Sequence, residues 1–192
     1  MKSNFGNSRN ALRVREIALC GMFTALAVAI SFAENLSGIN SLMPVPGVKL
    51  GLANIAVIGA LLCTGGIGAF AVMLMRCLIT FLCFGNAVGF FISLSGGALS
   101  VTAVCTVLRT GLFRKMGGFC SLIGVSAASA FFHAAGQLIA AALSVGNSAV
   151  LTAAPIICAL SVITGIVTGI AANTVYRVLS GTGIADNYIS LD

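Results

Sequence analysis

Residues 67–84 read IGAFAVMLMRCLITFLCF, a run that holds a single charged residue, Arg76. An α-helix needs about 20 predominantly apolar residues to cross the hydrocarbon core of a bilayer. The run therefore predicts a membrane-spanning helix. A charge at such depth is expensive and usually faces a protein interior or a water-filled cavity. The same segment thus indicates both the fold and a polar site within it.

Five further apolar runs accompany this segment. Two precede it, at about 17–33 and 49–63, and three follow it, ending near Leu112, Leu143 and Val178. Because short polar or glycine-rich breaks separate runs of nearly spanning length, the sequence predicts an all-α, polytopic membrane protein with about six transmembrane helices. No run alternates apolar and polar residues with period two, as the strands of a transmembrane β-barrel would.

Glycine and serine mark the expected breaks between these runs. Thr64 to Gly66 is expected to be a tight connection, and Gly146 to Ser148 to end the fifth run. Gly85 and Asn86 are expected to open an irregular segment, because such residues are frequent in loops, and SLSGGALS at 93–100 is expected to lead into the fourth run, with Ser93 and Ser95 at its beginning.

The composition agrees with a membrane protein and excludes other classes. Of 192 residues, 59% are hydrophobic and 7% are charged, whereas soluble domains average about 25% charged residues. Ten basic and four acidic residues cannot cover a soluble globule, and so apolar a chain is not disordered. The net charge of +6 lies mostly outside the apolar runs, with no Trp and two Tyr, which indicates topology-setting charge rather than nucleic-acid binding.

Basic residues near the ends of the predicted helices set the expected orientation. With six crossings they all fall on one side, which the positive-inside rule makes cytoplasmic. The chain is thus expected to have a basic N-terminal segment at 1–16, a transmembrane domain at 17–178 and a short tail at 179–192, both termini being cytoplasmic. The basic residues are Arg9, Arg13, Arg15, Arg109, Arg114, Lys115 and Arg177.

Polar residues at membrane depth are the candidate binding residues, and most belong to the expected outer half. They predict a polar cavity that opens outward and is capped by the PVPG loop at 44–47. Since basic groups outnumber the single acidic one there, an anionic ligand is expected. The candidate ligand-binding residues are Glu34, Lys49, Asn54, Arg76, Ser95, His133 and Gln137, with Ser93, Thr80 and Ser129 nearby.

Three of these residues have structural alternatives. Lys49 is equally explained by a side chain that reaches the membrane interface. Glu34 can cap a helix end or pair with Lys49. His133 can be a buried histidine that is hydrogen-bonded to Gln137 or to a backbone carbonyl. Arg76 has fewer alternatives, because a guanidinium never loses its charge and needs an anion or water beside it.

Small residues recur at spacing four on two predicted helices. Such stripes let helices approach closely in membranes. Gly165 and Gly169 are interpreted as internal packing. Gly21, Ala25 and Ala29 are either internal packing or a face that receives another protein.

Several chemistries find no support in the sequence. There is no P-loop, and Asp186 and Asp192 lie in the tail, so no aspartate cluster could hold Mg²⁺ and a diphosphate. The seven cysteines form no CxxC pair and are interpreted as small buried hydrophobic residues. We therefore predict no catalytic residue, no metal site and no cofactor, although haem or quinone at His133 stays open.

Four stretches resemble a known bacterial membrane family. They are PGVKLGLANIAVIGALL at 46–62, RCLITFLCFG at 76–85, SLSGGALS at 93–100 and GVSAASAFFHAAGQLIAA at 124–141. The family is described as heptaprenyl diphosphate synthase component I and also as Gx transporter. It is similar to the substrate-binding (S) components of energy-coupling factor (ECF) transporters, which are six-helix proteins that capture micronutrients.

The resemblance implies a function and partners. The chain would be an S component that takes a small ligand from outside, with a transmembrane T component docked on Gly21, Ala25 and Ala29 and ATPase subunits in separate chains. The synthase name instead implies prenyl diphosphate elongation, for which the chain lacks aspartate-rich motifs. The alternative is therefore a non-catalytic membrane subunit of prenyl diphosphate or quinone metabolism, or of flavin-based extracellular electron transfer.

Overall fold

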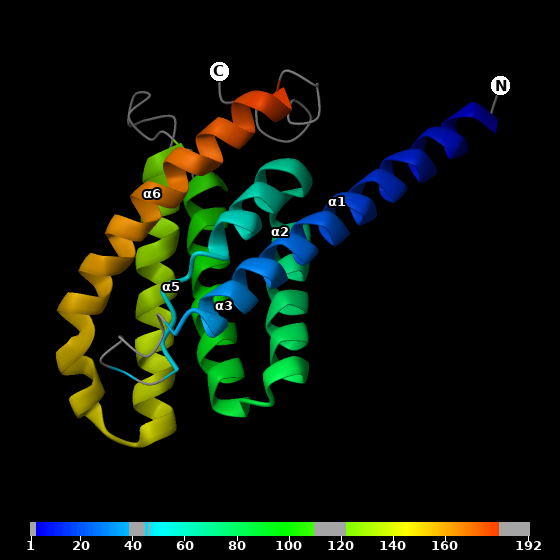
Figure 1. The fold of residues 1–192 in the computed structure, drawn as a ribbon. Coiled ribbons are helices and arrows are strands. Elements are labelled where there is room, and N and C mark those ends of the chain that lie inside the picture. Colours follow the sequence, from blue (N-terminus) through cyan, green and yellow to red (C-terminus); the bar gives the residue numbers. More distant parts are fainter. Residues whose placement is uncertain (1–2, 39–44, 46, 110–121, 181–192) are drawn as a thin grey trace.

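A computed structural model describes residues 3–38, 45, 47–109 and 122–180 of the chain. The described residues form helices and no strands, which confirms the all-α class. Arg114, Lys115 and most of the loop between the first two predicted helices lie outside the described residues. The helices are α1 (Ser3–Leu36), α2 (Asn54–Phe84), α3 (Ala87–Arg109), α5 (Leu122–Val145), the short 3₁₀ helix η2 (Ser148–Ala153) and α6 (Ala154–Ser180) (Figure 1).

The expected number of six membrane-spanning helices is not confirmed. In the described part of the chain, five helices are long and apolar enough to cross a membrane. The difference lies in α2, which joins the second and third predicted runs without a loop between them. Its first arm, residues 54–64, has 11 residues and a length of about 16 Å, roughly half of the bilayer core.

Gly65 separates the two arms of α2. Its φ of 75° and ψ of −173° are not helical, and only glycine adopts such a conformation at low cost. Contacts with α3 show that the chain reverses there. Asn54 donates a hydrogen bond to Ser100 at the start of the first arm, while a Cβ at Gly66 would lie 2.9 Å from the Cys105 sulfur. The first arm therefore runs in the same direction as α3 and the second runs opposite to it (Figure 1).

The prediction of an irregular segment that begins at Gly85 and Asn86 and lasts until a helix starts near Ser93 is wrong. Gly85, with a φ of 66°, ends α2 by donating its backbone N–H to the Phe81 carbonyl, and α3 begins at Ala87. The glycines and serines of 93–100 lie inside α3, where they permit close packing. A Cβ at Gly97 would lie 2.6 Å from the Met73 side chain. Small residues in membrane helices thus indicate helix contact more than a break.

Helices α5 and α6 pack closely, as the spacing of their small residues predicts. A Cβ at Gly165 would lie 2.8 Å from the Ala127 Cα, and one at Gly169 would lie 2.7 Å from the Ile123 Cα. A side chain at either position would clash with the backbone of α5, so only glycine lets the two helices approach this closely. The stripe on α6 is therefore internal packing.

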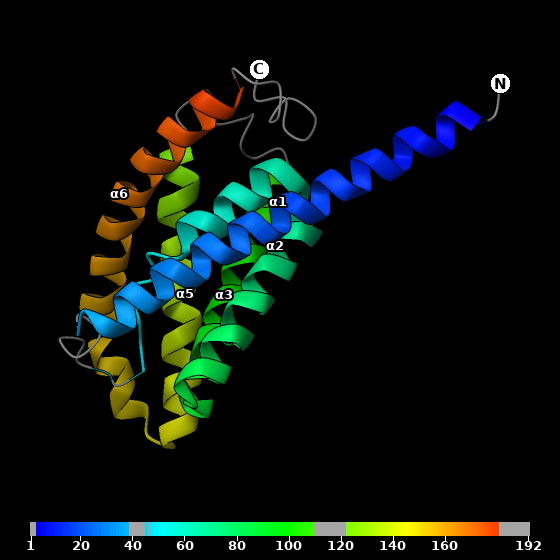
Figure 2. The same cartoon turned by 45° about the vertical axis from the view of Figure 1, so that its right-hand side comes forward.

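Several helix ends meet at one end of the bundle. Figure 2 shows the amino end of α5, the carboxyl ends of α3 and α6, and the Gly65 bend together there, with α1 extending beyond them. The turn between α2 and α3 and the start of α6 lie at the opposite end. Helix α1 begins at Ser3, so the described part of the basic N-terminal segment is helical and continuous with the first apolar run.

Candidate functional site: a polar cavity between five segments

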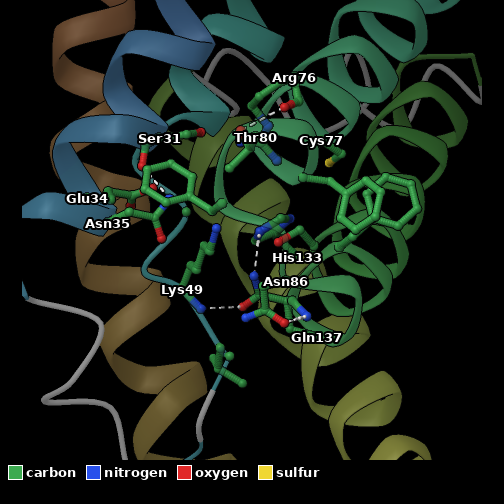
Figure 3. Close-up of a pocket in the computed structure, with 18 residues that line it drawn as sticks. Ser31, Glu34, Asn35, Lys49, Arg76, Cys77, Thr80, Asn86, His133 and Gln137 are labelled. Atoms are coloured by element: carbon green, nitrogen blue, oxygen red, sulfur yellow. Dashed lines mark hydrogen bonds between the residues drawn. The ribbon is translucent and has the colours of Figure 1, made fainter.

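A cavity of about 520 Å³ lies between α1, the segment 47–51, the second arm of α2, the first half of α3, and α5 (Figure 3). It lies toward the α2–α3 turn. Its lining combines charged, polar and aromatic side chains. The lining residues are Ser31, Glu34, Asn35, Gly47, Val48, Lys49, Gly51, Arg76, Cys77, Thr80, Phe81, Phe84, Asn86, Gly89, Phe90, Ser93, His133 and Gln137.

The structure gathers five of the seven predicted ligand-binding residues around this cavity. Glu34, Lys49, Arg76, His133 and Gln137 all line it, although they come from four different segments. Two of the elements that carry them, α1 and α5, are separated by more than 80 residues in the sequence. These five polar residues therefore share one site, as expected from the cost of placing them against lipid.

Arg76 is the residue of this group whose burial most requires a partner, because its guanidinium is always charged. It is 5% exposed and lies on the cavity wall. The Thr80 hydroxyl one turn later donates to the Arg76 backbone carbonyl at 2.8 Å, so it does not serve the guanidinium. Within the described part of the chain, no hydrogen bond is made by the Arg76 guanidinium. A guanidinium has five N–H donors of fixed geometry, which suit a carboxylate or a phosphate, and this one belongs to a residue of the cavity wall.

Glu34 and Lys49 complete the charged wall. Glu34 is 4% exposed, and its carboxylate accepts the backbone N–H of Leu52 at 2.9 Å. Lys49, which lies between the membrane-spanning helices, has its pKa lowered by burial, an effect that the nearby Glu34 charge opposes and Arg76 reinforces. Two cations and one carboxylate therefore share the cavity, which leaves a net positive charge on its described lining.

His133 and Gln137 tie the segment around Lys49 to α5. The Lys49 backbone N–H donates to Gln137 Oε1 at 3.2 Å, so the Gln137 amide nitrogen faces His133 Nε2, 3.1 Å away. A backbone N–H can only donate, and this fixes the amide orientation. His133 Nε2 is then the acceptor of a neutral ring that carries its proton on Nδ1. The alternative of a hydrogen-bonded buried histidine is thus realised at the cavity wall.

Two predicted binding residues do not line the cavity. Asn54 is buried at the start of α2 and donates to the hydroxyls of Ser129, at 2.6 Å, and Ser100, at 3.4 Å. It joins α2 to α3 and α5. Ser95 is exposed on the opposite face of α3 from Ser93, which does line the cavity.

The aromatic lining was missed by the sequence interpretation. Phe81, Phe84 and Phe90 border the cavity together with the polar residues Ser31, Asn35 and Asn86. On α2 a signal was available, because Thr80 and Phe84 follow Arg76 at spacing four and therefore share its helix face. On α1 Ser31 and Asn35 are likewise four residues apart, so the same signal was available there, whereas Asn86 in the α2–α3 turn belongs to no helix face.

The stripe of small residues on α1 is not internal packing in this structure. Gly21, Ala25 and Ala29 are all exposed, and a Cβ at Gly21 would meet no atom within 4 Å. This face of α1 therefore carries small residues and is not covered by the described part of the chain. Whether a partner docks there is a question of function.

Among the residues that the structure describes, no three His, Cys, Asp or Glu side chains come together in a group that could hold a metal ion. Glu34, Cys77 and His133 line the cavity, but they are not close enough together to form such a group.

Comparison with known families supports the resemblance found in the sequence. The family model described as heptaprenyl diphosphate synthase component I matches residues 23–175, which include all the lining residues of the cavity. The chain matches no curated protein and no solved structure.

Proposed function

The chain belongs to the heptaprenyl diphosphate synthase component I family, and from this premise we propose that it is the substrate-binding (S) component of an ECF-type importer. It captures a small anionic ligand from the extracellular side in the cavity beside Arg76. The helices embed it in the bacterial cytoplasmic membrane, and ATP hydrolysis occurs on separate chains.

The observation that carries this proposal is the buried Arg76 guanidinium, which faces a cavity without a hydrogen bond to any described residue. A buried cation without a sufficient partner costs several kcal/mol. Binding an anion would recover that cost, and Lys49 adds a second positive charge to the same wall. Such a site favours binding of an anionic ligand without requiring a chemical step.

The exposed face of α1 supports the transport part of the proposal. Gly21, Ala25 and Ala29 offer a flat surface on which a helix of a T component can lie closely. With both termini in the cytoplasm, the cavity lies in the outer half of the bundle, where an S component receives its ligand. Docking on α1 would then couple the loaded bundle to its ATPase subunits.

A second function is favoured by the family's description. A membrane subunit that holds a prenyl diphosphate or a quinone precursor, without catalysing its synthesis, would also use a cationic wall beside apolar residues. The two functions differ in partners. An importer copurifies with a T component and ATPase subunits, whereas the second function requires a soluble prenyl-transferring partner.

Mass spectrometry of small molecules that copurify with the protein in zwitterionic nanodiscs tests the proposal. The unchanged protein and Arg109→Gln, whose arginine is exposed at the end of α3, should carry the same anionic compound. Arg76→Gln should have lost it. A compound retained in Arg76→Gln, or an isoprenoid diphosphate as the bound species together with a copurified synthase, would refute the importer assignment.

A further inference from the structure

The ligand class can be narrowed by the apolar part of the cavity, an inference that rests on the anion-binding function proposed above. We infer that the cavity takes an elongated amphipathic anion, whose acidic group lies at Arg76 and whose flat or apolar body lies along Phe81, Phe84 and Phe90 toward the α2–α3 turn. A small hydrated anion, such as inorganic phosphate, would use only one part of such a site.

The phenylalanines border the cavity in two ring pairs, whose cavity-lining members Phe81, Phe84 and Phe90 are here called the aromatic wall. Phe81 of α2 and Phe90 of α3 pair with ring centroids 5.2 Å apart, and Phe84 pairs with Phe32 of α1 at 4.8 Å. These pairs connect three helices around the cavity. Each ring is held by a neighbouring ring, so the wall keeps its shape when the cavity is empty.

The arrangement along α2 gives the site a direction. Arg76, Thr80 and Phe84 succeed one another at spacing four on the face that lines the cavity. At 1.5 Å per residue, Arg76 and Phe84 lie about 12 Å apart along the helix axis. A ligand that reaches both needs a length of roughly 10–12 Å by the same rise, which is longer than any simple inorganic anion.

A buried serine on α3 also lines the cavity, one turn after Phe90. Ser93 of α3 is 9% exposed and lines the cavity, and its hydroxyl has no hydrogen-bond partner in the described part of the chain. A buried hydroxyl without a partner is costly. It follows Phe90 by one turn, so a ligand lying on the aromatic wall would present a polar atom to it.

Aromatic phosphates test this inference directly. Binding of 2-naphthyl phosphate, inorganic phosphate and the neutral 2-naphthol is measured by calorimetry on the full chain in phosphatidylcholine nanodiscs. The expected result is that 2-naphthyl phosphate binds at least 10-fold more tightly than either fragment, because it engages both walls. Equal affinities for 2-naphthyl phosphate and inorganic phosphate would overturn the inference.

Variants assign the two parts of the ligand. Phe84→Ala should weaken 2-naphthyl phosphate about 10-fold, the scale of losing an aromatic contact and its buried area, and leave inorganic phosphate within about twofold. The matched control is Phe131→Ala, since Phe131 of α5 is as exposed as Phe84, at 42%, but does not line the cavity. An equal loss in both variants would contradict the aromatic wall.

Two further outcomes separate this inference from its premise. If both phosphates depend on Arg76 but not on Phe84, the anion site stands and the amphipathic ligand is refuted. If neither depends on Arg76, the proposed function fails as well. Because a membrane phospholipid is also an amphipathic anion, the titration is repeated in phosphatidylglycerol nanodiscs. A 10-fold weaker binding of 2-naphthyl phosphate there would assign the cavity to a lipid headgroup and overturn a soluble ligand.

Discussion

At position 76 a lysine would keep the charge of the arginine but lose the planar fork that holds two oxygens at once. If Arg76 grips the ligand, Arg76→Lys should weaken binding by roughly 1.5–3 kcal/mol, the scale of hydrogen bonds to charged groups, or about 10- to 100-fold. The melting temperature of the ligand-free protein should change little. Calorimetry with 2-naphthyl phosphate and a thermal melt measure both quantities.

The contrary case at the same position is a structural ion pair. Glu34 lies close enough to Arg76 for their charges to interact. If that pair holds α1 against α2, Arg76→Gln and Glu34→Gln should both lower the melting temperature of the ligand-free protein markedly. An unchanged affinity in Arg76→Gln would remove the residue from the binding site.

The predictability of the site also differs from residue to residue. Arg76 and His133 could be identified because a polar group in an apolar run must face the interior. The choice between Ser93 and Ser95 required the rotation of α3, which the sequence does not reveal because hydroxyl residues occur on both faces of this helix. Asn54 met the same criterion as Arg76, yet its partners proved to be two serines, since depth alone does not separate a cavity from a helix contact.

At the scale of helices, the contact between α3 and α5 positions His133 and Gln137. A Cβ at Gly136 would lie 2.8 Å from the Ser95 carbonyl oxygen and 2.9 Å from the Gly96 Cα, both backbone atoms. Gly136→Ala must therefore separate the helices, at a cost of about 1–3 kcal/mol for overpacking. We expect a lower melting temperature and weaker ligand binding.

Gly124→Ala is the control for this contact. Gly124 lies on the same helix, and a Cβ there would meet nothing within 4 Å. Because alanine also favours helices over glycine, its melting temperature should be unchanged or higher. Equal melting temperatures for the Gly136 and Gly124 variants would show that α3 and α5 tolerate a larger separation.

Helix α1 permits a test of partner binding. Ala25→Leu places a branched side chain in the centre of the exposed stripe and should abolish copurification with a T component, while the protein alone keeps its melting temperature. Ala71→Leu, an equal change at an exposed position of α2, should leave copurification intact. Affinity purification from membranes with quantitative mass spectrometry measures both. Retention of the T component by Ala25→Leu would exclude this face.

Helix boundaries illustrate why the sequence predicts some elements better than others. The long apolar runs of α1, α5 and α6 are evident from hydropathy alone. The start of α3 was placed near Ser93 instead of Ala87 because Gly85 and Asn86 are typical loop residues, yet inside lipid the backbone must satisfy its own hydrogen bonds and stays helical. The bend in α2 was expected at Thr64 to Gly66, but its consequence, two arms without a connecting loop, depends on one φ angle at Gly65.

For the whole molecule, the orientation is the property to test. Both termini and the segment with Arg114 and Lys115 should be cytoplasmic, because basic residues near helix ends resist translocation. In a cysteine-free background, Lys115→Cys should resist an impermeant thiol reagent in intact cells, whereas Ser148→Cys at the opposite end of the bundle should react. Labelling at position 115 would invert the assigned topology.

The reversal at Gly65 also determines the end of the bundle from which each later helix starts. Because α2 bends back on itself like a hairpin, its second arm carries the chain back toward the end of the bundle from which the first arm came. The orientation of every later helix depends on this return. A straight helix of 31 residues would measure about 46 Å, more than the roughly 30 Å of a bilayer core. It would end on the other side of the bilayer, and each later helix would then run in the opposite direction. One glycine with a φ of 75° thus decides at which end of the bundle each described helix after α2 begins and ends.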